Sequence, residues 1–179
     1  KLYNTIGITF LRQTNHELSK KYLKDSLRIR KQIEDVRGLA STYHNLGNLL
    51  NETGEQVEAL FYYKKSLLIR TQIKDYLGIA ACQVSIANLL IKKNNCKEAE
   101  SHLFTGLEIA KQCNAKHWEA SAYLNYAFLY EKLNDYKKAL ESKIAYENIK
   151  TELNSKNANR QINELVVQFE TENKKREAE

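Results

Sequence analysis

The chain has 179 residues, with 28 Lys and Arg against 22 Asp and Glu, a formal net charge of +6, and a hydrophobic content of 42%. It contains no Pro and only 6 Gly, which excludes collagen-like and proline-rich linker sequences and favours long helices joined by short turns. The length is sufficient to bury a sizeable core, and the charges are too balanced for a disordered tail. We therefore expect a folded, all-α protein.

We find neither a membrane-spanning segment nor a targeting signal in the sequence. No apolar run approaches the roughly 20 residues that a membrane-spanning helix needs, and no charged-then-apolar leader is present. Because the first residue is Lys1 rather than Met, we interpret the chain as a fragment or a processed form. We expect a cytoplasmic location, with the periplasmic face of a membrane-anchored protein as the alternative.

The sequence repeats itself with a period of 40 residues. Segment 43–50 aligns with 83–90, with 123–130 and, near the start, with 3–10. Apolar residues recur three, four and seven positions apart, so each of the four repeats (1–35, 36–75, 76–115 and 116–155) predicts two amphipathic helices. In chain order, the expected helices are 2–13, 16–33, 37–53, 56–73, 77–93, 96–113, 117–133 and 136–153.

The turns between the two helices of a repeat have suitable chemistry. The residues that follow the first helix tolerate the left-handed backbone conformation; they are Gly54, Asn94 and Asn134. The next position can cap the second helix with a side-chain oxygen; the residues there are Asn15, Asn95 and Asp135.

Small residues recur where the helices of a repeat must approach closely. In the first helices they are Gly7, Gly47, Ala87 and Ala127, and in the second helices Ala59, Ala99 and Ala139. A single hairpin of this kind cannot bury its apolar face alone, whereas four stacked hairpins form a continuous core.

These residues resemble the tetratricopeptide repeat. The second repeat carries that motif as Tyr43, Leu46, Gly47, Leu50, Ala59, Tyr63 and Ser66. The resemblance covers about 1–153, although the period exceeds the family's usual length of about 34 residues. It implies an all-α solenoid of helical hairpins, a right-handed superhelix of about four hairpins followed by a C-terminal helix. The array would occupy 1–155, and a C-terminal capping helix leading to a charged linker would occupy 156–179.

The resemblance also implies a binding surface, because in this family the first helices line a concave groove. The corresponding residues are Ile8, His44, Asn45, Asn48, Asn51, Val84, Asn88, Ile91, Leu124, Asn125 and Phe128, with Asn4, Leu11 and Glu131 beside them. Asn side chains offer a donor and an acceptor to the amides of an extended peptide. The apolar members either mark an interaction site or pack against a neighbouring helix.

The tail has two interpretations. Residues Ile162, Leu165, Val166 and Phe169 share one helical face and are followed by charged residues only. The segment 163–175 resembles the end of the repeat array in bacterial signalling proteins, where a coiled-coil or membrane-spanning linker and an output domain follow. The simpler interpretation is a capping helix that shields the last hairpin. This helix is also a candidate surface for dimerisation.

We find no constellation of residues for catalysis or for a cofactor. Phosphate-binding glycine loops, metalloprotease motifs and nucleophile elbows are missing from the sequence. Cys82, Cys96 and Cys113 are too scattered for a disulfide framework or a structural zinc site, and the basic residues of 20–31 fall on several faces of one helix. We therefore expect no enzyme activity, metal, cofactor or nucleic-acid contact.

The sequence predicts a module that binds a peptide or a protein segment. We expect it to be the sensory or scaffold region of a bacterial signal-transduction regulator, such as a two-component system protein. The alternatives are a free-standing adaptor and the peptide-sensing domain of a transcription regulator.

Overall fold

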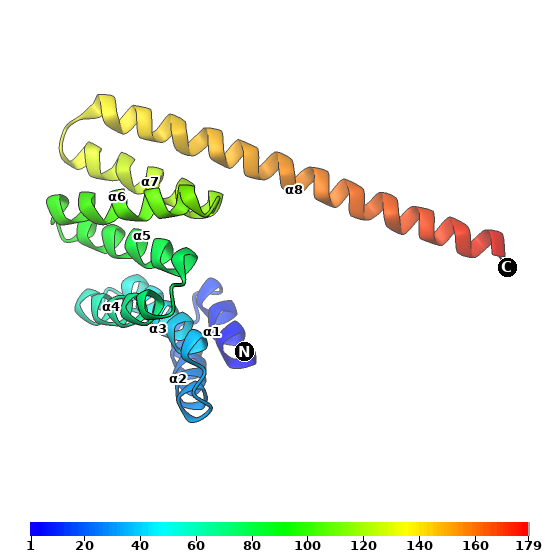
Figure 1. The fold of residues 1–179 in the computed structure, drawn as a ribbon, viewed down its shortest axis with the longest axis horizontal. Coiled ribbons are helices and arrows are strands. Elements are labelled where there is room, and N and C mark those ends of the chain that lie inside the picture. The colour runs from blue at the N-terminus through cyan, green and yellow to red at the C-terminus, as the bar shows by residue number, and fades with distance from the viewer. Residues whose placement is uncertain (179) are drawn as a thin grey trace.

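The protein is an array of helical hairpins (Figure 1), seen in a computed structural model that describes residues 1–178, apart from the side chains of 157, 160–162, 165–166 and 168–178. The described residues form eight helices and no strand. The helices are α1 (Leu2–Arg12), α2 (His16–Gln32), α3 (Val36–Glu52), α4 (Gln56–Gln72), α5 (Tyr76–Lys92), α6 (Cys96–Gln112), α7 (Lys116–Lys132) and α8 (Tyr136–Ala178). Consecutive helices pair and neighbouring pairs stack, which confirms the predicted solenoid.

The turns between helices repeat every 20 residues. Each contains one residue with positive φ, and these residues are Thr14, Glu34, Gly54, Lys74, Asn94, Asn114 and Asn134. The left-handed conformation expected at Gly54, Asn94 and Asn134 is therefore confirmed, and it also occurs at the four other turns.

Side-chain caps start several helices. Asn15 accepts a hydrogen bond from the backbone N–H of Leu18, and Asp135 accepts one from Lys138, as expected. The prediction for Asn95 is wrong, because its side-chain nitrogen donates to Glu98 at 2.5 Å and does not cap α6.

The first helix of each hairpin lies on the inside of the curved array. Contacts join α1 to α3, α3 to α5 and α5 to α7, whereas the backbones of the second helices lie farther apart within the described chain. Lys20 of α2 nevertheless pairs with Glu55 at the start of α4. Helix α5, at the centre, is the most buried of the first helices and supplies Ile86, Ala87, Leu89 and Leu90 to the main core cluster. The concave surface is therefore built from α1, α3, α5 and α7.

Glycine permits the close approach of the two helices in a hairpin. A Cβ atom added to Gly47 would lie 2.5 Å from Cδ1 of Tyr63, and one added to Gly7 would lie 2.8 Å from Cγ of Leu23. Ala59 and Ala99 are fully buried on the facing helices. The predicted positions of the interhelical contact are confirmed.

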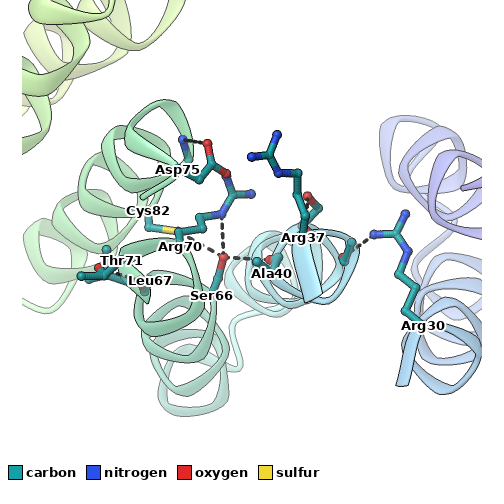
Figure 2. A network of polar contacts seen from close by, with 12 residues as sticks. Arg30, Arg37, Ala40, Ser66, Leu67, Arg70, Thr71, Asp75 and Cys82 are labelled. Atoms are coloured by element: carbon teal, nitrogen blue, oxygen red, sulfur yellow. Dashed lines mark hydrogen bonds and ion pairs between the residues drawn. The ribbon is translucent and has the colours of Figure 1, made fainter. Parts of the chain in front are cut away.

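An arginine with little exposed surface fastens each of the first two junctions between hairpins. At the second junction, Arg70 donates to Asp75 at 3.0 Å and to Ser66, and Ser66 donates to the carbonyl of Ala40 (Figure 2). Asp75 also accepts from the N–H of Gly78. At the first junction, Arg30 donates to the carbonyl of a glycine that Asp35 caps in the same way.

Helix α8 is a single helix of 43 residues that begins against α7 and then leaves the array (Figure 1). The expected C-terminal helix is thus the direct continuation of the last hairpin and not a separate element. Lys143, Glu147 and Lys150 occupy positions that hold Leu103, Leu107 and Ala110 in α6, so the outer face of α8 is too polar to receive another hairpin. The expected docking of Ile162, Leu165, Val166 and Phe169 concerns side chains outside the described residues.

Candidate functional site: the concave surface

The concave surface contains two neighbouring pockets. The first, of about 430 Å³, lies between α1 and α3 and is closed on one side by the start of α7. Its lining residues are Ile8, Leu11, Arg12, His44, Asn45, Asn48, Asn51, Glu52 and Trp118. The structure thus brings Ile8, His44, Asn45, Asn48 and Asn51, expected from the sequence, into one site.

The second pocket, of about 500 Å³, lies between α5 and α7 and is mainly apolar. Its lining residues are Asn88, Ile91, Lys92, Asn125, Phe128, Glu131 and Lys132. The Phe128 side chain is 48% exposed, although it is large and apolar. Both volumes fall in the range of roughly 300–1,000 Å³ that is typical of ligand pockets.

Asparagine amides connect the two pockets through a continuous chain of hydrogen bonds. Lys92 donates to Asn51 at 3.0 Å, Asn51 donates to Asn88 at 3.5 Å, and Asn88 donates to Asn125 at 2.7 Å. The chain ends where Asn125 donates to the carbonyl of Ser121 at 2.8 Å. Each amide nitrogen has two N–H groups, and Asn88 and Asn125 each use one in this chain, which leaves one on each of them for a ligand.

Two further asparagines of the first pocket also bond within the protein. Asn45 donates to Asn4 at 3.0 Å, and Asn48 accepts a hydrogen bond of 2.8 Å from the hydroxyl of Tyr63. The predicted asparagines therefore hold the repeats together while keeping part of their hydrogen-bonding capacity. The sequence indicated the surface but not these partners.

His44 forms the inner wall of the first pocket. Its ring lies 5.5 Å from the ring of Tyr63 and 6.1 Å from that of Trp118, and its Nε2 atom is 3.1 Å from the hydroxyl of Ser85. Burial, together with the positive charge of Arg70, lowers the pKa of His44 to about 4. The imidazole is therefore neutral at neutral pH and contributes an uncharged polar wall.

Two predicted site residues lie elsewhere. Val84 is only 2% exposed and belongs to the main core cluster, so its assignment to the groove is wrong. Leu124 lines a smaller pocket of about 280 Å³ between α7 and α8, with Tyr146 and Leu153. Ile91 lines the second pocket as predicted, although its side chain is almost completely buried.

Four charged residues and one aromatic residue of the two pockets were not predicted from the sequence. Arg12 and Glu52 lie at the first pocket and Lys92 and Lys132 at the second, one position after the residues that the family motif indicates. The aromatic residue is Trp118, which stands where the second and third repeats have Gly38 and Gly78. The replacement of this glycine by tryptophan was the feature of the sequence that could have indicated a special role for Trp118.

Neither a metal cluster nor a membrane helix is found in the part of the chain that the structure describes. No group of three His, Cys, Asp or Glu side chains there has the geometry to hold a metal ion. None of its helices is long and apolar enough to cross a membrane.

The comparisons with known proteins agree with this architecture. Two family models described as tetratricopeptide repeat match the chain, one at residues 1–72 and 38–112 and the other at 120–142. A crystal structure of BtubC (BKLC) from P. vanneervenii superposes with a TM-score of 0.71 at 15% identity, covering 85% of this chain and 63% of that one. No curated protein matches the sequence. The family models cover most of the four hairpins, and the chain belongs to the tetratricopeptide repeat family.

Proposed function

We propose that the chain is a non-enzymatic module that binds a peptide or protein segment on the concave surface of α1, α3, α5 and α7. The observation that supports this most directly is the pair of adjacent pockets, which Asn51 joins by lining the first and bonding to Asn88 and Lys92 of the second. A bound segment in an extended conformation would meet apolar walls, unused amide N–H groups and charged residues along the same path. Such a mixed surface suits a polypeptide better than a small uniform ligand.

Phe128 provides the sharpest test of this site. We would select binders from a phage-displayed library of random peptides, synthesise the strongest and measure its Kd for the parent and for Phe128→Ala. Since aromatic residues that a partner buries completely often dominate the binding energy, we expect the variant to bind at least about tenfold more weakly. Phe104→Ala is the matched control, because Phe104 is 64% exposed and lies on α6, outside the groove.

The result separates the concave surface from other sites. Equal affinity of the parent and the Phe128 variant, combined with weaker binding by the Phe104 variant, would move the site to the convex surface. A library from which the parent selects no peptide at all would contradict the proposal.

We infer further that the module is the sensory or scaffold region of a bacterial signal-transduction regulator, located in the cytoplasm. Helix α8 supports this inference, because it starts in the last hairpin, directly behind the groove, and leaves the array as one continuous helix (Figure 1). The same helix offers a surface for dimerisation. The reading frame beyond Glu179 tests the inference: a kinase or DNA-binding domain there supports it, whereas a stop codon favours a free-standing adaptor.

A further inference from the structure

Trp118 departs from the pattern that fastens the first two junctions. Its position in the repeat holds Gly38 and Gly78 at those junctions. A Cβ atom added to Gly38 would lie 2.8 Å from the guanidinium of Arg30, and one added to Gly78 would overlap that of Arg70. At these two junctions, a side chain at this position would displace the arginine or the aspartate that caps the helix.

At the third junction, the arginine, the capping aspartate and the glycine are all replaced by other residues. Ala110 replaces the arginine, Ala115 replaces the capping aspartate and Trp118 replaces the glycine. Because no guanidinium occupies the space beside α7, a large side chain is sterically allowed here. The first turn of α7 therefore carries an indole, which reaches the concave side.

The Trp118 side chain contacts both the main core cluster and the first pocket. It packs in part against the main core cluster, and it lines the pocket opposite residues of α1 and α3. Its ring meets the ring of His44 edge-on, at an interplanar angle of 84°. The fourth hairpin thus completes a site whose other walls come from the first two, and two aromatic rings form one of its corners.

The first pocket is chemically neutral. Arg12 and Glu52 carry opposite charges at its rim, and His44 has no charge at neutral pH because burial lowers its pKa to about 4. Ile8 and Leu11 supply an apolar wall opposite the rings. The two rim charges cancel, so the pocket has no net attraction for a charged side chain that would lose its hydration on entering.

The amides of the pocket match a polypeptide backbone. The oxygen of Asn48 accepts from the Tyr63 hydroxyl, which orients the amide and leaves its nitrogen to donate to a ligand carbonyl. The nitrogen of Asn45 is bonded to Asn4, which directs the Asn45 oxygen to accept from a ligand N–H. One donor and one acceptor beside an aromatic corner fit a single peptide unit with an aromatic side chain.

We propose that the pocket between α1, α3 and Trp118 binds an uncharged aromatic side chain, Phe or Tyr, of an extended partner segment, and that Trp118 determines this preference. This proposal rests on the proposed function, since it names the chemistry of the segment that the groove receives. Edge-to-face and offset-stacked contacts favour an aromatic guest over an aliphatic one of similar size.

Parallel selections test the preference. The same phage-displayed library is selected on the parent, on Trp118→Gly, which restores the residue of the other junctions, and on Phe128→Ala as the control in the second pocket. We expect one position of the peptides selected by the parent and by Phe128→Ala to be enriched in Phe or Tyr. Peptides selected by Trp118→Gly should lack this enrichment.

Two measurements guard against a trivial result. Trp118→Leu keeps apolar bulk at the junction, so a folded Trp118→Leu protein with the same loss of preference shows that the effect is not unfolding. Trp118 is also the only tryptophan of the chain, so its fluorescence reports directly on this pocket. A selected peptide should shift the emission, and its Phe→Leu version should bind at least tenfold more weakly.

The outcomes distinguish the two proposals. Peptides that bind the parent without an aromatic preference, or with one that survives in Trp118→Leu, would overturn the role of Trp118 and leave the groove intact. Failure to select any peptide would contradict the proposed function itself.

Discussion

At the scale of single residues, the array contains a buried hydroxyl without a partner. Ser19 is fully buried at a position that holds Ala59, Ala99 and Ala139 in the later hairpins, and its hydroxyl has no hydrogen-bond partner among the described residues. An unsatisfied buried hydroxyl costs roughly 1–3 kcal/mol. The first hairpin is thus less stable than its repeat pattern permits.

Replacing this serine should therefore stabilise the protein. We expect Ser19→Ala to raise the free energy of unfolding by about 1 kcal/mol, measured by urea denaturation. The control is Ser66→Ala, which should be destabilising because Ser66 donates to Ala40 and accepts from Arg70. Unchanged or lower stability of Ser19→Ala would show that the hydroxyl has a partner in solution.

The buried imidazole of His44 makes stability depend on pH. Its pKa is lowered from 6.5 to about 4 in the folded protein, so below pH 6.5 only the unfolded chain takes up the proton. The contribution of the neutral imidazole to the free energy of unfolding is fully present above pH 6.5. It should decrease by about 1.4 kcal/mol for each pH unit between pH 6.5 and about pH 4. Urea denaturation of the parent and of His44→Asn between pH 7.5 and 4.5 measures the difference, and parallel curves would contradict the assignment.

At the scale of elements, the sequence predicts helix boundaries well because the turns carry local signals. Gly54, Asn94 and Asn134 adopt the left-handed conformation as expected, and seven of the eight helices end within one residue of the predicted position. The exception is α8, where Asn154 stands at a turn position but the helix continues. In the other repeats, the chain turns at this position because the next hairpin packs against the helix that has just ended. The local sequence around Asn154 does not show whether such a hairpin follows.

The hairpin contact at Gly47 provides a test of packing. We expect Gly47→Leu to lower the stability by about 1–3 kcal/mol, because the new side chain meets the ring of Tyr63, which is buried and bonded to Asn48. Gly47→Ala should have a smaller effect in the same direction. Thermal denaturation measures both, and a parent-like melting temperature for Gly47→Leu would mean that the hairpin repacks freely.

Candidate site residues were less predictable than helices. The family motif indicates His44, Asn48 and Asn88 because it fixes which face of a first helix points inward. It does not indicate that Asn51 and Asn88, 37 positions apart, bond across repeats. It misplaces Val84 because the central helix α5 is covered on both sides. The role of Trp118 depends on the absence of an arginine eight residues earlier, which only the junction geometry explains.

At the scale of the whole molecule, α8 divides into a packed part and a projecting part. Residues near Ala139 and Ile149 are buried against α7, whereas the end of the helix extends past the array (Figure 1). We expect backbone amides of 139–153 to exchange hydrogen slowly and those beyond 160 to exchange faster, since an unsupported helix is marginally stable in water.

Dimerisation through α8 would change this pattern. Exchange beyond 160 should then become slower as the protein concentration rises, and Phe169→Ala should abolish the concentration dependence. Slow exchange beyond 160 at every concentration would instead indicate docking of the tail on the fourth hairpin.

The backbones of the inner helices lie in direct contact, whereas those of the outer helices are farther apart. The amide chain from Lys92 to Ser121 ties α3, α5 and α7 together, so the inner edge of the array should resist stretching. The outer edge is joined by fewer contacts, such as the ion pair of Lys20 with Glu55. A segment that binds from Ile8 to Phe128 would lie along the inner edge and would shorten or lengthen the array. The angle at which α8 leaves the array would change with it, so binding would be transmitted as a rotation of the packed part of α8.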